Sequence, residues 1–171
     1  MTNINEIATQ MVTPGKGILA ADESSGTIKK RFDSINVEST EENRMNYRRI
    51  LFETQEAMQN YISGVILFDE TLRQSNKDGK KLVDIINDAG SLPGIKVDMG
   101  AKELAFMSGE TVTEGLDGLR ERLEEYSNLG AKFAKWRAVI AISDKIPSSL
   151  CIDANSHALA RYSALYQEAG I

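Results

Sequence analysis

Short apolar runs alternate with amphipathic helical stretches along most of this 171-residue chain. The run GVILFDE at 64–70 is continuous, rich in branched and aromatic side chains and too short for a typical helix, which indicates a strand buried on both faces. Further strands are indicated within GKGILAADESSG (15–26), GIKVDMG (94–100) and AKFAKWRAVIAI (131–142). Buried strands that are separated by helices predict a parallel sheet built from βα units.

Four helical patterns accompany the predicted strands. They cover 39–61, which opens with a capping box, 78–90, which ends at Gly90, 116–130, and about 148–169, which is followed by Gly170. For the first we expect one helix with a buried stripe formed by Tyr47, Ile50, Leu51, Thr54, Met58 and Tyr61. In the third, the stripe is Leu116, Leu119, Leu123 and Tyr126. Four βα units fit half of a (β/α)₈ barrel or a small open doubly wound sheet, and the pattern alone does not separate the two.

Ionisable residues stand toward the C-terminal end of every predicted strand. They are Asp22 and Glu23, Asp69 and Glu70, Lys96 and Asp98, and Lys135 and Arg137. Barrel enzymes place their chemistry at this end of the strands, so a barrel would bring these groups into one mouth. The alternative is that the charges mark the places where buried strands emerge into water.

Two cations share one face of the predicted strand at 131–142. Alternation places Phe133, Lys135 and Arg137 on one side and Ala134 and Trp136 on the other. Burying an unpaired charge is costly, so the segment predicts an anionic ligand opposite Lys135 and Arg137. The alternative is an edge strand whose Lys and Arg stems lie on apolar surface with their charged heads in water.

A possible phosphate-binding turn follows the first predicted strand. The sequence ESSGT at 23–27 leads into Lys29, Lys30 and Arg31, and hydroxyls, backbone amides and cations can together hold a phosphate. A helix cap followed by a solvated basic turn is the alternative. No Rossmann or P-loop fingerprint occurs in the sequence.

Composition excludes several classes of function. A net charge of −5 gives no reason to expect nucleic acid or an anionic membrane as a partner, and no apolar run reaches membrane-spanning length. One histidine, His157, and one cysteine, Cys151, cannot form a His-rich or Cys-rich metal site. The polar N-terminal segment has no hydrophobic signal core and the single cysteine suits a reducing compartment, so we expect a cytoplasmic protein.

Six stretches in a fixed order resemble class I fructose-1,6-bisphosphate aldolase over essentially the whole chain. They are PGKGILAADESSGTIKKRF, TEENRMNYRRILF, SGVILFDETLRQ, PGIKVDMG, TEGLDGLRERLEEY and GAKFAKWRAVI. The resemblance implies an α/β fold of the (β/α)₈ TIM-barrel family, of which this chain holds about the first four βα units. It also implies reversible cleavage of fructose 1,6-bisphosphate, a glycolytic and gluconeogenic phosphosugar, to dihydroxyacetone phosphate and glyceraldehyde 3-phosphate. In that family a lysine imine carries the reaction without a metal or cofactor.

The resemblance also implies roles for individual residues. Asp22 corresponds to the aspartate beside the reacting carbon, and Lys135 to the lysine that assists formation and dehydration of the carbinolamine. Lys96 and Arg137 resemble the cations that contact substrate hydroxyl and phosphate groups, which would supply the anion that the 131–142 segment requires.

The serine-rich turn and Met99 complete the comparison with the family. Ser24 and Thr27 stand where the family contacts phosphate, and Thr27 keeps the hydroxyl of the serine that many relatives have there. Met99 stands where many relatives have a lysine, and no function is carried over to it.

The length of the chain differs from that of the family it resembles. A (β/α)₈ barrel typically takes about 250 residues, so we expect 1–171 to be an incomplete barrel domain, the N-terminal half of a parent enzyme that forms a homo-oligomer. The family's acid/base glutamate and imine-forming lysine lie beyond this stretch, so we expect the chain alone to be inactive. The alternatives are a natural half-barrel that binds phosphosugars or pairs with another half, and an interaction module without catalysis.

Overall fold

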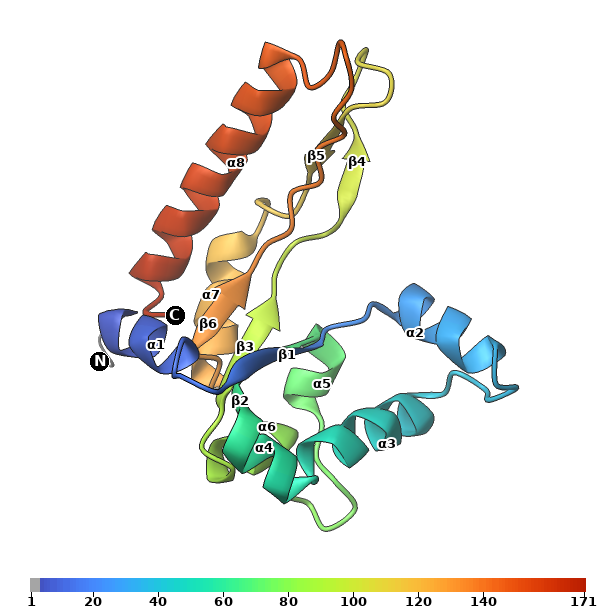
Figure 1. Ribbon diagram of the computed structural model, residues 1–171, viewed down its shortest axis with the longest axis vertical. Helices are drawn as coiled ribbons and strands as arrows, with labels where there is room; N and C mark the ends of the chain where they lie inside the picture. Colours follow the sequence, from blue (N-terminus) through green and yellow to red (C-terminus); the bar gives the residue numbers. More distant parts are fainter. Residues whose placement is uncertain (1–3) are drawn as a thin grey trace.

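A four-stranded parallel sheet lies at the centre of the structure (Figure 1). The computed structural model describes residues 4–171. The sheet has the order β1-β2-β3-β6, with bounds β1 (Gly17–Ala21), β2 (Ile62–Leu67), β3 (Leu92–Lys96) and β6 (Phe133–Lys135). All three pairings are parallel, which confirms the predicted sheet of βα units.

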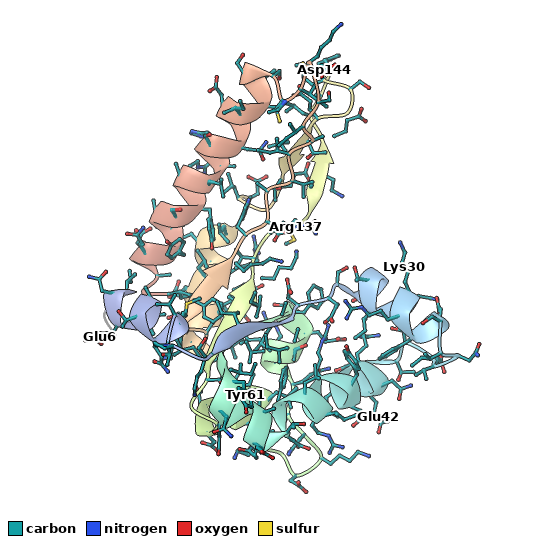
Figure 2. All side chains as sticks on the ribbon, viewed as in Figure 1. Glu6, Lys30, Glu42, Tyr61, Arg137 and Asp144 are labelled. Carbon is teal, nitrogen blue, oxygen red and sulfur yellow. The ribbon has the colours of Figure 1, made fainter. Side chains whose placement is uncertain are left out.

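Helices precede, connect and follow the strands of the sheet, and Figure 2 draws the described side chains on them. They are α1 (Ile4–Met11), α2 (Ser25–Asp33), α3 (Glu41–Phe52), α4 (Gln55–Tyr61), α5 (Asp69–Arg73), α6 (Leu82–Asp88), α7 (Leu119–Asn128) and α8 (Ser149–Glu168). The predicted helices within 78–90, 116–130 and 148–169 are confirmed by α6, α7 and α8. Gly90 and Gly170 follow α6 and α8 with φ angles of 77° and 73°, the left-handed conformation that glycine adopts at low cost after a helix.

The core lies between the sheet and the helices around it. Fully buried Val65, Leu67 and Ile95 come from the strands, and Leu82 and Leu123 meet them from α6 and α7. Inside the sheet, the ring of Phe133 presses on Gly94 so closely that a Cβ built there would lie 2.3 Å from it. Glycine at position 94 therefore makes room for Phe133.

The predicted helix at 39–61 is two helices, α3 and α4. Thr40 is the N-cap of α3, since its side chain accepts a hydrogen bond from the Asn43 amide at 3.1 Å. Helical structure is interrupted between Phe52 and Gln55, so the residues of the expected stripe do not all lie on one helix face. Of the expected stripe, Ile50, Thr54 and Tyr61 are exposed and Met58 is buried. The other buried residues of these helices are Met45, Arg48 and Phe52.

The segment 131–142 is a strand only at Phe133–Lys135. Beyond Lys135 it runs beside an antiparallel ribbon that the sequence pattern did not predict, β4 (Ala101–Glu103) with β5 (Thr111–Thr113). The Thr113 hydroxyl donates a hydrogen bond to the Arg137 carbonyl at 2.8 Å. This side-chain contact holds the segment where β6 has no further strand pairing within 4–171. In Figure 1 the ribbon extends beside the N-terminal half of α8, and the Asn155 amide group donates to the Thr111 carbonyl at 2.9 Å.

Candidate active site

The C-terminal ends of the four parallel strands border one pocket of about 610 Å³. Such an end is where barrel enzymes build their sites. The structure brings to this pocket all six residues that the resemblance assigned to the site, namely Asp22, Ser24, Thr27, Lys96, Lys135 and Arg137.

Lys135 and Asp22 meet across the sheet. The Lys135 Nζ atom lies 2.6 Å from Asp22 Oδ2, although the residues are 113 positions apart. β6 and β1 are the two edges of the sheet, which in a flat sheet would be about 14 Å apart at about 4.8 Å per strand. A lysine side chain does not cover that span, so the sheet must curl toward a barrel, which favours the half-barrel over the open doubly wound sheet.

Lys96 and the backbone of Arg137 are tied together by Asp98. The Lys96 ammonium lies 2.7 Å from Asp98 Oδ1, and Asp98 Oδ2 accepts the Arg137 amide at 3.2 Å. Asp98 is almost completely buried, while Lys96 keeps about a fifth of its side chain exposed toward the pocket. The Arg137 side chain is exposed, and its guanidinium makes no ion pair with another residue of 4–171. It is therefore available to an anion entering the pocket.

The turn at 23–27 is a helix N-terminus that faces the pocket. Ser24 is the N-cap of α2 by its backbone angles, but its hydroxyl lies 3.1 Å from the Thr27 hydroxyl and caps no backbone amide. A helix start carries unpaired amides and a partial positive charge, both favourable to an anion. The segment is therefore a helix start, and its role in phosphate binding stays a prediction.

Asp69 and Glu70 do not join the pocket, contrary to the expectation for the strand ends. The chain turns into α5 immediately after Phe68, and both carboxylates line a separate depression between α3 and α5. There Asp69 pairs with Arg73 at 2.9 Å, and Glu70 pairs with Arg44 at 2.5 Å. Phe68 itself lines the pocket.

Several further pocket residues are not among the six that the resemblance assigned to the site. Glu23 and Arg31 both line the pocket and form an ion pair with each other, and Met99 lies there largely exposed. The signal for Arg31 was present in the basic run after the turn. Phe68 gave no signal, because an aromatic residue at the end of an apolar strand is expected in a core.

The described residues show neither a metal centre nor a membrane span. No group of three or more His, Cys, Asp or Glu side chains within 4–171 is arranged to hold a metal ion. None of the helices in the same range combines the length and the apolar character needed to cross a bilayer.

The comparisons with known proteins agree on one family. The profile of the Fructose-bisphosphate aldolase class-I family, described as glycolytic, matches residues 3–171. A probable fructose-bisphosphate aldolase class 1 of Xanthomonas campestris is 61% identical over 166 residues, which is 97% of this chain and 49% of that protein. Cytosolic fructose-bisphosphate aldolase 4 of Arabidopsis thaliana is 57% identical over 164 residues, which is 96% of this chain and 42% of that protein.

A solved structure has the same fold. Fructose-bisphosphate aldolase of Plasmodium falciparum, in complex with TRAP and a small-molecule inhibitor, superposes with a TM-score of 0.91 at 45% identity. The match covers 98% of this chain and 49% of that one, so the four βα units correspond to part of the aldolase (β/α)₈ barrel. The chain spans about half the length of the relatives it matches. It belongs to the class-I fructose-bisphosphate aldolase family.

Proposed function

We propose that this chain supplies the phosphosugar-binding side of an aldolase site that reversibly cleaves fructose 1,6-bisphosphate. The products are dihydroxyacetone phosphate and glyceraldehyde 3-phosphate. The observation that carries the proposal is the pairing of Lys135 with Asp22 at 2.6 Å inside a pocket that also presents three further cations and a helix N-terminus. Such a pocket suits a ligand with phosphate groups and hydroxyls.

Proton transfer is the work proposed for Lys135 and Asp22. An ammonium in contact with a carboxylate can give a proton to a leaving hydroxyl and recover one, as carbinolamine formation and dehydration require. The imine itself forms, by resemblance to the family, on a lysine that lies outside the matched stretch. Lys135 therefore acts as the assisting acid and not as the nucleophile.

Binding is the work proposed for the remaining pocket residues. Arg137 offers a planar fork of donors to a phosphate, and Lys96, held by Asp98, offers a fixed ammonium to a hydroxyl or phosphate oxygen. Ser24 and Thr27 add hydroxyls at the start of α2, where the helix dipole favours an anion.

The proposal includes the surroundings in which the enzyme works. We infer one incomplete barrel domain over 1–171, a homo-oligomeric whole enzyme in the cytoplasm, and a small-molecule ligand with no nucleic-acid partner. The names of cytosolic relatives from plants support the compartment. The net charge of −5 supports the absence of a nucleic-acid partner.

Two measurements test the proposal. The first is calorimetric titration of this chain with fructose 1,6-bisphosphate, which should show saturable binding that is lost when Lys96, Lys135 and Arg137 are all changed to Met. The second is cleavage by a completed enzyme, defined as this chain joined to the part of the Xanthomonas relative that it does not cover. Cleavage should persist in EDTA and stop when borohydride is added during turnover, because borohydride reduces an imine.

The outcomes separate the possible functions. Binding by the chain with no cleavage by a soluble completed enzyme would favour a phosphosugar-binding half-barrel. Equal binding by the triple variant would contradict the proposed pocket altogether.

A further inference from the structure

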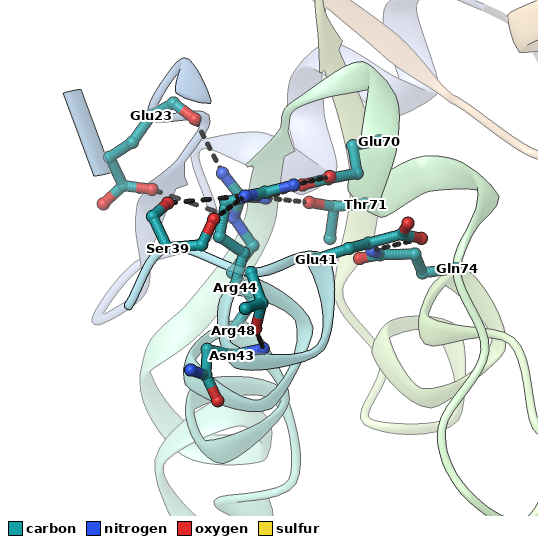
Figure 3. A network of polar contacts seen from close by, with 10 residues as sticks. Glu23, Ser39, Glu41, Asn43, Arg44, Arg48, Glu70, Thr71 and Gln74 are labelled. Atoms are coloured by element: carbon teal, nitrogen blue, oxygen red, sulfur yellow. Dashed lines mark hydrogen bonds and ion pairs between the residues drawn. The ribbon is translucent and has the colours of Figure 1, made fainter. Parts of the chain in front are cut away.

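Arg48 lies behind the candidate pocket and is completely buried. It stands on α3 within the stripe that this helix buries, three residues after Met45 and four before Phe52. Figure 3 shows its side chain among Glu23, Glu70 and Thr71. Burial of a guanidinium is costly unless its donors are used, so its contacts indicate what the residue holds in place.

One contact of Arg48 is with the end of β1. Its Nη2 atom donates a hydrogen bond to the backbone carbonyl of Glu23 at 2.6 Å. A peptide unit is planar and trans, so fixing the Glu23 carbonyl also fixes the opposite direction of the Ser24 amide in the same unit. Glu23 stands between Asp22 and Ser24, two residues that line the pocket. Arg48 thus holds the backbone from which both side chains project.

A second set of contacts is with Phe68 and with α5, the helix that follows β2. The Nη1 atom donates to the Thr71 hydroxyl at 2.7 Å and lies 3.4 Å from Glu70 Oε2. The guanidinium carbon lies 5.8 Å from the centre of the ring of Phe68, a residue of the pocket wall. One buried side chain therefore connects the segment that follows β1 with the segment that follows β2.

Charges of alternating sign connect Arg48 to the pocket. Arg44 forms a two-pronged pair with Glu70, Glu70 pairs with Arg48, and the Glu23 carboxylate lies between Arg48 Nε, at 4.0 Å, and Arg31. Hydrogen bonds from Arg44 lower the pKa of Glu70, so this carboxylate stays ionised beside Arg48. Arg31, the last member of the series, lines the pocket.

We propose that Arg48 is a positioning residue that fixes the Asp22–Ser24 backbone and, through it, one phosphate subsite at the start of α2. The inference rests on the proposed function, because it assigns Arg48 to the phosphosugar site of this chain. Arg48 touches no ligand in this account and acts only through Glu23, Thr71 and Phe68. Its loss should therefore weaken the binding of one phosphate group and leave the other subsite of the pocket unchanged.

The test compares three ligands with four variants of the chain. The dissociation constants of fructose 1,6-bisphosphate, fructose 1-phosphate and fructose 6-phosphate are measured by calorimetry for the parent chain, Arg48→Met, Arg48→Lys and Thr71→Val. Arg49→Met is the matched control, since Arg49 is the next residue on α3 and pairs outward with Glu53. Thr71→Val removes one hydrogen-bond acceptor of Arg48 and leaves the guanidinium buried. This variant therefore still tests the proposal if Arg48→Met does not fold.

Selective weakening is the expected result. Arg48→Met should weaken bisphosphate binding about tenfold, the loss of roughly one charge-assisted contact, and weaken one of the two monophosphates to the same extent. The other monophosphate and the Arg49→Met control should bind as in the parent. Arg48→Lys and Thr71→Val should weaken binding of the same ligands by a smaller factor, about twofold to fivefold, because each variant keeps part of the contacts that Arg48 makes.

Other outcomes overturn the inference in distinguishable ways. Equal weakening of both monophosphates, or lower stability with unchanged binding in every variant, would show that Arg48 supports only the fold. A folded parent chain that binds none of the three ligands would overturn the proposed function and the inference with it.

Discussion

The Lys135 ammonium lies 2.6 Å from an Asp22 carboxylate oxygen, although Lys135 ends β6 and Asp22 follows β1, the two opposite edges of the parallel sheet. The contact places a proton donor and a proton acceptor together in the pocket at the C-terminal ends of the strands. Both side chains are largely but not fully buried, so the pair is accessible to a ligand in the pocket. The proposed function assigns proton transfer to this pair.

Changing Lys135 to Met should lower turnover of the completed enzyme much more than it weakens substrate binding. General acid–base assistance contributes about 10²–10⁴-fold to a rate, so turnover should fall by at least about 100-fold while KM changes by less than about threefold. Steady-state kinetics decides, with Lys145→Met as a control at an exposed lysine. Turnover within about twofold of the parent, together with a raised KM, would show that Lys135 is a binding residue.

Replacing Asp98 should destabilise the chain and release Lys96. Asp98 compensates a partly buried ammonium and accepts two backbone amides, those of Gly100 and Arg137. Asp98→Ala should therefore lower the free energy of unfolding by about 2–4 kcal/mol, and Asp98→Asn by less, because the amide oxygen still accepts a hydrogen bond. Urea unfolding measures both. The control Asp33→Asn removes an exposed pair with Lys29 and should lower the free energy of unfolding by less than about 1 kcal/mol. An equally small loss for Asp98→Ala would contradict the prediction.

Adding a methyl group at Gly94 should strain the inside of the sheet. The new Cβ would lie 2.3 Å from the Phe133 ring, and overpacking of this kind costs about 1–3 kcal/mol. Gly17→Ala is the matched control on β1, because no atom lies within 4 Å of the point that its new Cβ would occupy. Phe133→Leu in the Gly94→Ala background should recover part of the loss in urea unfolding. If Gly94→Ala is as stable as Gly17→Ala, the close packing of Phe133 on β3 is wrong.

Acid should remove the contribution of Glu70 to stability. Hydrogen bonds from Arg44, opposed by partial burial, lower the pKa of Glu70 below its ordinary value of 4.5. A lowered pKa in the folded state means that the stabilisation is complete above 4.5 and is lost as the pH falls through the folded-state value. The stability difference between the parent and Glu70→Gln should therefore shrink between about pH 6 and about pH 3 in urea titrations. A constant difference over that range would contradict the ion pair.

The order of strands and helices could be predicted because its signals are local. Apolar runs such as the one that holds Val65 and Leu67 identify buried strands from a few neighbouring residues, and glycines such as Gly90 mark helix ends. The β4–β5 ribbon could not be predicted, because its strands have only three residues each and the side chains of β4 are exposed, which leaves no alternation of apolar and polar residues long enough to indicate a strand.

The chemistry of the strand ends was predictable only in part. Lys135 and Arg137 could be singled out because alternation in an apolar segment predicts one face for both cations. The strand ends at Lys135, however, and the pairing of Lys135 with Asp22 depends on the curl of the sheet. The burial of Arg48 depends on Glu23 and Thr71, which lie 25 and 23 positions away. Sequence patterns favour an exposed position for any arginine, so long-range contacts of this kind cannot be read from them.

Amide NMR of the chain during titration with fructose 1,6-bisphosphate tests the central claim most directly, because it reports where the ligand binds. The account predicts saturable shifts concentrated at Ser24, Thr27, Lys96 and 135–137, the residues that border the pocket at the strand ends. Shifts confined to the apolar groove between α1 and α8, which Ile7 and Tyr166 line, would contradict it. So would the absence of any shift at the strand ends in a folded chain at saturating ligand.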